Sequence, residues 1–197
     1  SKVVWMVDRL DGTIEFKYGG DRYSVMFGRY HNGRPDLGVA YAPAAKTLYY
    51  AERGQGAWRQ LGDAPLEQLH VNHVDQLAEA RFVVRKPAAP TDSRPALDEF
   101  DAALPIKARI PDASICLKFG RIAAGEAEAS INTNRKGSKW DTCAPQVVLE
   151  EAGGIVTDLD GNPLDYTQPA LSWERSFVAS NGILHPQVLE LCKELDF

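Results

Sequence analysis

The chain is poor in cysteine and has no long apolar run. Its three cysteines, Cys116, Cys143 and Cys192, are widely spaced and form no CxxC pair. An odd number of scattered cysteines argues against a disulfide framework or a thiolate zinc site. No apolar stretch approaches the roughly 20 residues that a membrane-spanning helix needs, and the first residues lack the layout of a secretion signal. We therefore expect no membrane partner and a cytoplasmic location.

An excess of positive charge is also missing. The 22 lysines and arginines are outnumbered by 27 aspartates and glutamates, which gives a formal net charge of −5. This balance argues against a nucleic-acid polymer as partner, and it offers no general attraction for a phosphorylated ligand. Any phosphate that binds here needs local help from metal ions, backbone N–H groups or individual basic residues.

Strand and helix patterns interleave along the chain, which predicts a layered α/β fold. Short β-prone runs separated by turns predict an antiparallel meander over residues 23–59. The polar stretch 66–80 predicts a helical or irregular connection. Apolar residues at helical spacing predict a helix over 114–125, and a further helix opens at Trp140-Asp141.

The strongest local feature is the run DRLDGT at residues 8–13, which follows a short apolar strand. Two carboxylates three residues apart, Asp8 and Asp11, can converge on a hard cation at the end of a strand. Oxygen ligands of this kind suit Mg²⁺, and the carbonyl oxygen of Leu10 is a further candidate ligand. An ordinary Asp-Gly turn capped by Asp8 explains the run equally well when it is taken alone.

The backbone after Asp11 is suited to an anion. Gly12 allows a close approach, and the N–H groups of Gly12 and Thr13 would face a phosphate if a helix begins there. A second acidic position, Asp141, lies far along the chain at a predicted helix N-terminus. In isolation, Asp141 is better explained as a helix cap.

Taken together, three segments resemble the inositol monophosphatase superfamily. VVWMVDRLDGTIEF is similar to its signature W-x-V-D-P-[IL]-D-G-T-x-[NE]-F, and KWDTCAPQVVLEEAGG is similar to its signature W-D-x-[AC]-A-x-x-x-[IVL]-x-x-x-A-G-G. The run that begins at Ser114 resembles the S-x-x-L-K-x-x-x-I-A segment between them. The pair Glu15-Phe16 and the wording WDTCAP resemble the 3'(2'),5'-bisphosphate nucleotidases within the superfamily.

The resemblance implies a Mg²⁺-dependent phosphatase with two or three bound ions and inhibition by Li⁺. It also implies which residues bind the metals, hold the phosphate and activate the attacking water. These residues lie in two short segments of the chain. Asp8 bridges two metals, the Leu10 carbonyl binds one, Asp11 and Asp141 bind the other, Gly12 and Thr13 hold phosphate, and Thr13 with Asp11 takes the catalytic role.

Two further residues match positions near the family's substrate pocket. We assign Ser114 and Lys118 to the substrate or its second phosphate, with a solvated helix charge as the alternative for Lys118. Asp112 and Ala113 stand where the family usually has a glycine before the serine. This difference weakens the expectation of a tight phosphate-binding turn at that point.

The chain departs from the family in two other respects. Family members have some 70 to 80 further residues before the first signature, including a metal-binding glutamate in a Glu-Glu segment, and Arg9 replaces the usual proline. A fragment of a longer chain, a partner or homodimer that supplies the absent part, and a short relative with weakened catalysis all remain open. We expect weak Mg²⁺ binding and slow turnover, and an apolar sheet face that is bare or covered by a partner.

We therefore expect an N-terminally truncated αβαβα sandwich of the sugar-phosphatase type. Residues 1–79 would supply the rest of a first α/β layer with the first metal motif, and residues 80–197 a second α/β domain with the second motif. The expected substrate is a small phosphorylated molecule, with 3'-phosphoadenosine 5'-phosphate favoured. Inositol monophosphatase or fructose-1,6-bisphosphatase activity is the alternative, and a catalytically incomplete metal or nucleotide binder is the alternative from another class.

Overall fold

The structure, a computed structural model, describes residues 3–87, 95–132 and 137–195. Its strands and helices alternate along the chain. The strands are β1 (Val3–Asp11), β2 (Ser24–His31), β3 (Arg34–Ala42), β4 (Thr47–Glu52), β5 (Ala57–Leu61), β6 (Glu67–Leu69), β7 (Arg81–Arg85), β8 (Ala108–Asp112), β9 (Ala129–Asn132), β10 (Ile155–Asp158) and β11 (Phe177–Ser180). The helices are α1 (Thr13–Lys17), η1 (Leu77–Glu79), α2 (Pro95–Ala103), α3 (Ile115–Ala123), α4 (Lys139–Glu151) and α5 (His185–Glu194).

These strands form two sheets. The first has six strands in the order β1-β2-β3-β4-β5-β6, and each strand pairs antiparallel with its neighbour in sequence. The second has five strands in the order β10-β11-β9-β7-β8, with β7 parallel to both β8 and β9. The predicted layered α/β class and the predicted meander are confirmed.

Two strands were absent from the sequence-based prediction. The stretch 66–80, predicted as a helical or irregular connection, contains the edge strand β6 before it turns into η1. Two of the three β6 residues are exposed and polar, so no apolar alternation marks the strand. β8 was also missed, because only its last residue is buried in a short run that includes a proline.

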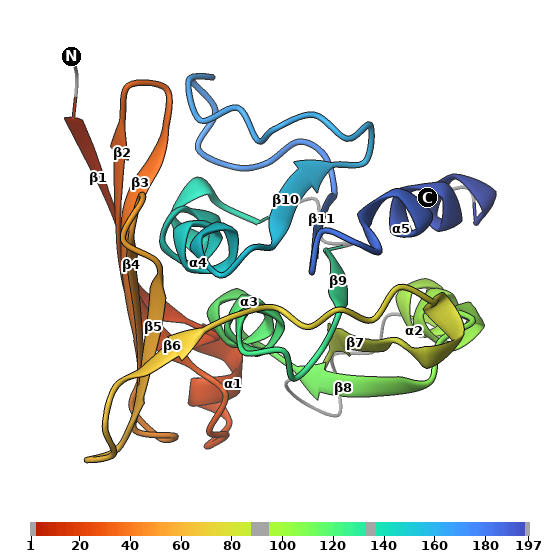
Figure 1. Cartoon of the computed structure of the whole chain (residues 1–197), viewed down its shortest axis with the longest axis horizontal. Coiled ribbons are helices and arrows are strands. Elements are labelled where there is room, and N and C mark those ends of the chain that lie inside the picture. The colour runs from red at the N-terminus through yellow and green to blue at the C-terminus, as the bar shows by residue number, and fades with distance from the viewer. Residues whose placement is uncertain (1–2, 88–94, 133–136, 196–197) are drawn as a thin grey trace.

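The layers are arranged as sheet, helices, sheet, helices. Figure 1 shows α3 and α4 between the two sheets, with α2 and α5 beyond the second sheet. Helix α4 approaches the first sheet closely because Gly28 and Gly38 stand opposite each other on β2 and β3. A Cβ atom on Gly38 would lie 2.2 Å from the carbonyl oxygen of Ala144 in α4. The glycine pair therefore sets the distance between α4 and the first sheet, and with it the position of the α4 N-terminus.

Two apolar clusters hold these layers together. One joins the inner face of the first sheet to α3 and α4 and continues to Phe177 on the second sheet. The other joins the far face of the second sheet to α2 and α5 around Phe82 and Val178. Because the first cluster contains residues from both sheets, the predicted domain boundary near residue 79 stays a prediction.

The outer face of the six-stranded sheet is apolar and exposed. Trp5, Val7 and Phe27 are 56%, 50% and 48% exposed, and Tyr41 extends the same face. No helix in the described part of the chain covers this face (Figure 1). The expected apolar sheet face is therefore present, and its cover by a partner stays a prediction. Separately, none of the described helices is both long enough and apolar enough to cross a lipid bilayer.

Candidate metal-binding site

The run at residues 8–13 lies where β1 passes into α1. The pairing of β1 with β2 becomes irregular between Asp8 and Asp11, so the strand bends there rather than ending at Asp8. The carboxylate of Asp8 accepts a hydrogen bond from the Leu10 N–H at 2.9 Å, and the Thr13 hydroxyl donates to the Leu10 carbonyl at 2.7 Å. These two bonds hold the bend in a fixed shape.

Gly12 makes the sharp entry into α1. Its φ of 80° lies in the left-handed region, and a Cβ atom there would meet the carbonyl oxygen of Arg22 at 2.6 Å. Both facts demand glycine at this position. The first N–H groups of α1, which have no partner within the helix, follow Asp11 directly in the chain.

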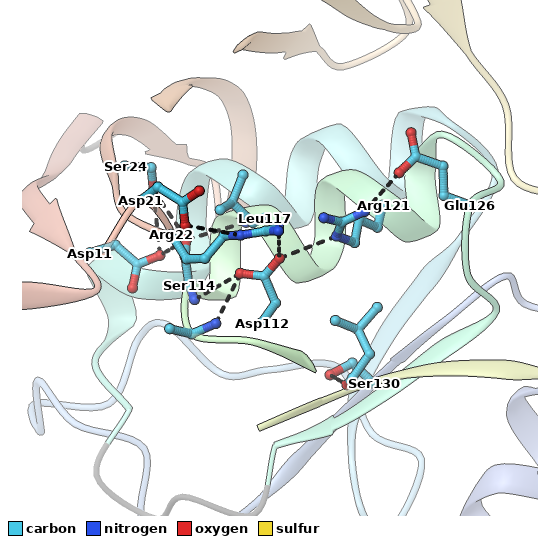
Figure 2. Close-up of polar contacts among 12 residues, drawn as sticks. Asp11, Asp21, Arg22, Ser24, Asp112, Ser114, Leu117, Arg121, Glu126 and Ser130 are labelled. Atoms are coloured by element: carbon cyan, nitrogen blue, oxygen red, sulfur yellow. Dashed lines mark hydrogen bonds and ion pairs between the residues drawn. The ribbon is translucent and has the colours of Figure 1, made fainter. Parts of the chain in front are cut away.

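Asp11 is tied to the start of α3. It is only 8% exposed, and its Oδ2 accepts a hydrogen bond from the Ser114 hydroxyl (Figure 2). The same oxygen accepts the Cys116 N–H at 3.2 Å. The Ser24 hydroxyl lies 3.5 Å from the same oxygen. Burial raises the pKa of Asp11 to about 6, and the charge of Asp8 adds to this rise, although the bonds from Ser114 and Cys116 oppose it.

Asp141 reaches the same place from the N-terminus of α4. Its Oδ2 accepts a hydrogen bond from the Ser138 N–H at 2.7 Å, so Asp141 is the third helical residue of a capping box, and the N-cap is Ser138 rather than Asp141 as the sequence suggested. The pKa of Asp141 is raised to about 7, mainly by burial. The charges of Asp11 and Asp8 and a hydrogen bond to Asp8 contribute to this rise, and the bond from Ser138 opposes it. The capping box and the acidic cluster thus share one side chain.

The three aspartates predicted as ligands are therefore gathered by the fold. Among residues 3–87, 95–132 and 137–195, no three His, Cys, Asp or Glu side chains are arranged as a ready metal-binding group. The donor set is nevertheless suited to a hard cation, because it consists of oxygens alone. The pKa values of Asp11 and Asp141 are raised by burial and by repulsion within the cluster, and the charge of Lys118 offsets only part of this rise at Asp11.

The two predicted substrate residues lie close to this cluster, and they differ in burial. Ser114 is fully buried and caps α3 by accepting the Leu117 N–H at 3.2 Å, while its hydroxyl donates to Asp11. Burial lowers the pKa of Lys118, and the charges of Asp112 and Asp101 oppose this shift. Lys118 is only partly buried, so its alternative assignment as a solvated helix charge stays open. Substrate binding by either residue stays a prediction.

Sequence patterns alone did not predict the ion pairs around the cluster. Asp112 is fully buried between Arg22 and Arg121 (Figure 2), and Glu15 is 3% exposed and paired with Lys86. The partners Arg22 and Asp112 are 90 positions apart, so no local pattern could have linked them. The one available signal was Asp112 itself, an acidic residue where the family usually has glycine.

Comparison with known proteins places this geometry in a family. The model of the inositol monophosphatase family matches residues 1–196. The chain is 29% identical over 192 residues to the fructose-1,6-bisphosphatase/inositol-1-monophosphatase of Thermotoga maritima, covering 98% of this chain and 68% of that protein. It is 30% identical over 207 residues to the probable 3'(2'),5'-bisphosphate nucleotidase 4 of Arabidopsis thaliana, covering 96% of this chain and 58% of that protein.

The fold comparison agrees with the sequence comparison. The solved structure of the Thermotoga maritima IMPase superposes with a TM-score of 0.81 at 26% identity, covering all of this chain and 70% of that one. The layered architecture predicted from the sequence is therefore that of solved relatives.

Proposed function

The chain belongs to the inositol monophosphatase family, and from this premise we propose that it is a metal-dependent phosphomonoesterase. The observation that carries the proposal is the meeting of Asp8 and Asp11, at the end of β1, with Asp141, at the start of α4. Residues 130 positions apart in sequence are brought together by the fold into an acidic, oxygen-only cluster beside a helix start.

Each residue of the cluster has a distinct task in this proposal. Asp8, Asp11, Asp141 and the Leu10 carbonyl would hold two or three Mg²⁺ ions. Bound there, Mg²⁺ would lower the pKa of a water molecule and neutralise charge on the phosphate oxygens. Thr13 keeps the Leu10 carbonyl aligned through its 2.7 Å hydrogen bond, and we assign it the orientation of the attacking water.

The phosphate would lie over the start of α1. Gly12 adopts the left-handed conformation that turns the chain there, and the backbone N–H groups of Gly12 and Thr13 supply the donors. Glu15 does not take the place of the family's upstream glutamate, because its carboxylate is buried against Lys86.

The favoured substrate is 3'-phosphoadenosine 5'-phosphate, converted to AMP and phosphate. The pair Glu15-Phe16 and the run WDTCAP support it, as does the likeness to a relative named as a bisphosphate nucleotidase. Inositol monophosphate or fructose 1,6-bisphosphate is the alternative, supported by the likeness to a relative named for both activities. A metal or nucleotide binder without turnover is the alternative from another class.

One experiment separates these functions. Phosphate release is measured from 3'-phosphoadenosine 5'-phosphate and from inositol monophosphate across a Mg²⁺ titration, for the wild type, Asp8→Asn and the distant control Asp63→Asn. We expect Mg²⁺-dependent release from the nucleotide, loss of that release in Asp8→Asn, no change in Asp63→Asn, and inhibition by Li⁺. Faster release from inositol monophosphate would select the alternative substrate, and tight nucleotide binding with no release from either would refute the phosphatase.

A further inference from the structure

Two part-buried ion pairs connect the segment around α1 with the second sheet. Glu15 of α1 pairs with Lys86, which directly follows β7. Arg22, in the loop between α1 and β2, pairs with Asp112, the last residue of β8, at 3.3 Å. The polarity of the two pairs is opposite, because the acid is on the α1 side in one and on the second-sheet side in the other.

The carboxylate ends of these pairs cannot remain unpartnered. Glu15 is 3% exposed and Asp112 is fully buried. Loss of the cation from a buried carboxylate is strongly destabilising, although Asp112 also pairs with Arg121 at 3.2 Å. Lys86 and Arg22 keep about a third of their side-chain surface in solvent. Each pair therefore consists of a buried carboxylate and a basic side chain that is partly exposed to solvent.

Asp112 links the second pair to the candidate metal site. Its Oδ1 accepts the Ala113 N–H at 2.9 Å and the Ser114 N–H at 3.4 Å, so it orders the backbone that leads into α3. Its Oδ2 accepts bonds from Arg22 and, at 3.2 Å, from Arg121 (Figure 2). The Lys86 N–H donates to the Asp112 carbonyl at 3.1 Å, which joins the two pairs at the second-sheet end.

The contacts continue from Asp112 to Asp11. Ser114, whose backbone Asp112 holds, donates its hydroxyl to Asp11, and the N–H of Cys116 in the same helix turn donates to the same oxygen. Arg22 also borders the turn directly, because its carbonyl oxygen is the atom that excludes a side chain at Gly12. A shift of Arg22 would therefore change the position of Asp11 by two routes, one through Asp112 and Ser114 and one through the turn at Gly12.

We propose that Glu15–Lys86 and Arg22–Asp112 form an inter-sheet clamp that positions Asp11 for its cation. The four residues are positioning residues, since they act through Ser114, Cys116 and the Gly12 turn rather than on a ligand. The opposite polarity gives the clamp its specificity, because a slide that brings Lys86 toward Arg22, or Glu15 toward Asp112, places like charges together. This inference rests on the proposed function only in taking Asp11 as a metal ligand.

The test compares Arg22→Met with Arg22→Lys and with Arg29→Met. Arg29 is a matched control, because it forms a part-buried ion pair with Asp36 inside the first sheet at 2.8 Å and has 28% of its side chain exposed. Two quantities are measured on the whole chain. One is hydrogen exchange of the Cys116 amide relative to that of Val178 in β11, without metal; the other is the Mg²⁺ concentration that gives half of the thermal stabilisation.

We expect Arg22→Met to accelerate exchange at Cys116 and to raise the half-saturating Mg²⁺ concentration about 10-fold, as removal of outer-shell support does at metal sites. Arg22→Lys should restore most of both, and Arg29→Met should change neither. If Arg22→Met only lowers the melting temperature, as Arg29→Met does, the clamp is refuted. A wild type that Mg²⁺ does not stabilise would also refute it.

The first pair gives an independent check. The exchange of partners in the double variant Glu15→Lys with Lys86→Glu should keep the Mg²⁺ requirement within about twofold of the wild type, while Glu15→Gln alone raises it. Equal effects of the double and single variants would contradict the clamp. If the wild type releases no phosphate from any substrate while these shifts still appear, the proposed function fails and the clamp stands.

Discussion

Replacement of Asp141 by asparagine should stabilise the metal-free chain at pH 8. Burial, together with the charges of Asp11 and Asp8, raises the pKa of Asp141 from 3.8 to about 7. Between these two values the unfolded chain has lost the proton while the folded chain still keeps it. The folded state therefore loses stability as the pH rises from about 4 to about 7, and it is fully penalised above that range.

The size of the effect follows from the shift. Three pKa units correspond to about 4 kcal/mol at 1.36 kcal/mol per unit. Asparagine carries no charge, and its amide oxygen can still accept the Ser138 N–H that the carboxylate accepts at 2.7 Å. Because an amide is a weaker acceptor than a carboxylate, we expect a net gain of about 2–4 kcal/mol at pH 8 and little gain at pH 4.

Urea unfolding followed by tryptophan fluorescence measures this gain in EDTA at pH 4, 6 and 8. The exposed variant Asp63→Asn serves as the control and should match the wild type at every pH. Addition of Mg²⁺ should stabilise the wild type by about 1.4 kcal/mol at ten times its dissociation constant, and should not stabilise Asp141→Asn. If Asp141→Asn is less stable than the wild type at pH 8, or if its gain in stability does not depend on pH, the pKa of Asp141 is not raised in the folded chain and the reasoning fails.

Three other perturbations test separate parts of the structure. Burial lowers the pKa of His185 from 6.5 to about 4. Acidification from pH 7 to 4 should therefore lower the free energy of unfolding of the wild type by about 3 kcal/mol more than that of His185→Gln, as measured by urea unfolding of both proteins. Gly12→Ala should cost at least about 2 kcal/mol and abolish phosphate release, whereas Gly33→Ala, which has a similar φ and open space around it, should cost about half as much and release phosphate normally. Thr13→Val should lower kcat about 10- to 100-fold with an unchanged melting temperature, and Thr13→Ser, which keeps the hydroxyl bonded to the Leu10 carbonyl, should restore it in a steady-state assay.

Local patterns account for most of what the sequence predicted of the fold. The meander followed from β-prone runs separated by turn residues, and Asn32-Gly33 indeed turns between β2 and β3 with positive φ at both positions. The helix predicted to open at Trp140-Asp141 begins at Lys139. Where side chains did not alternate, as in the exposed β6, the pattern carried no information and the strand was missed.

The candidate site was predictable in part for a different reason. Asp8 and Asp11 are neighbours in sequence, so their nearness is a local property, but nothing in the spacing of Asp141 indicates that it joins them. Its place in the cluster came from the family resemblance, and the raised pKa of Asp141 agrees with it. The role of the three aspartates as metal ligands stays a prediction that the Mg²⁺ titration addresses.

The ion pairs and the acidic cluster make sense together. Two predicted ligands with raised pKa values repel each other and Asp8 at neutral pH, and this repulsion acts between β1, which supplies Asp8 and Asp11, and α4, which supplies Asp141. Packing of α4 on the Gly28–Gly38 pair resists it from one side. On the other side, Asp11 is held through Ser114 by Asp112, whose charge is matched by Arg22 and Arg121. The three aspartates can therefore stay close together despite their mutual repulsion, because the packing of α4 and the ion pairs of Asp112 hold β1, α3 and α4 in place.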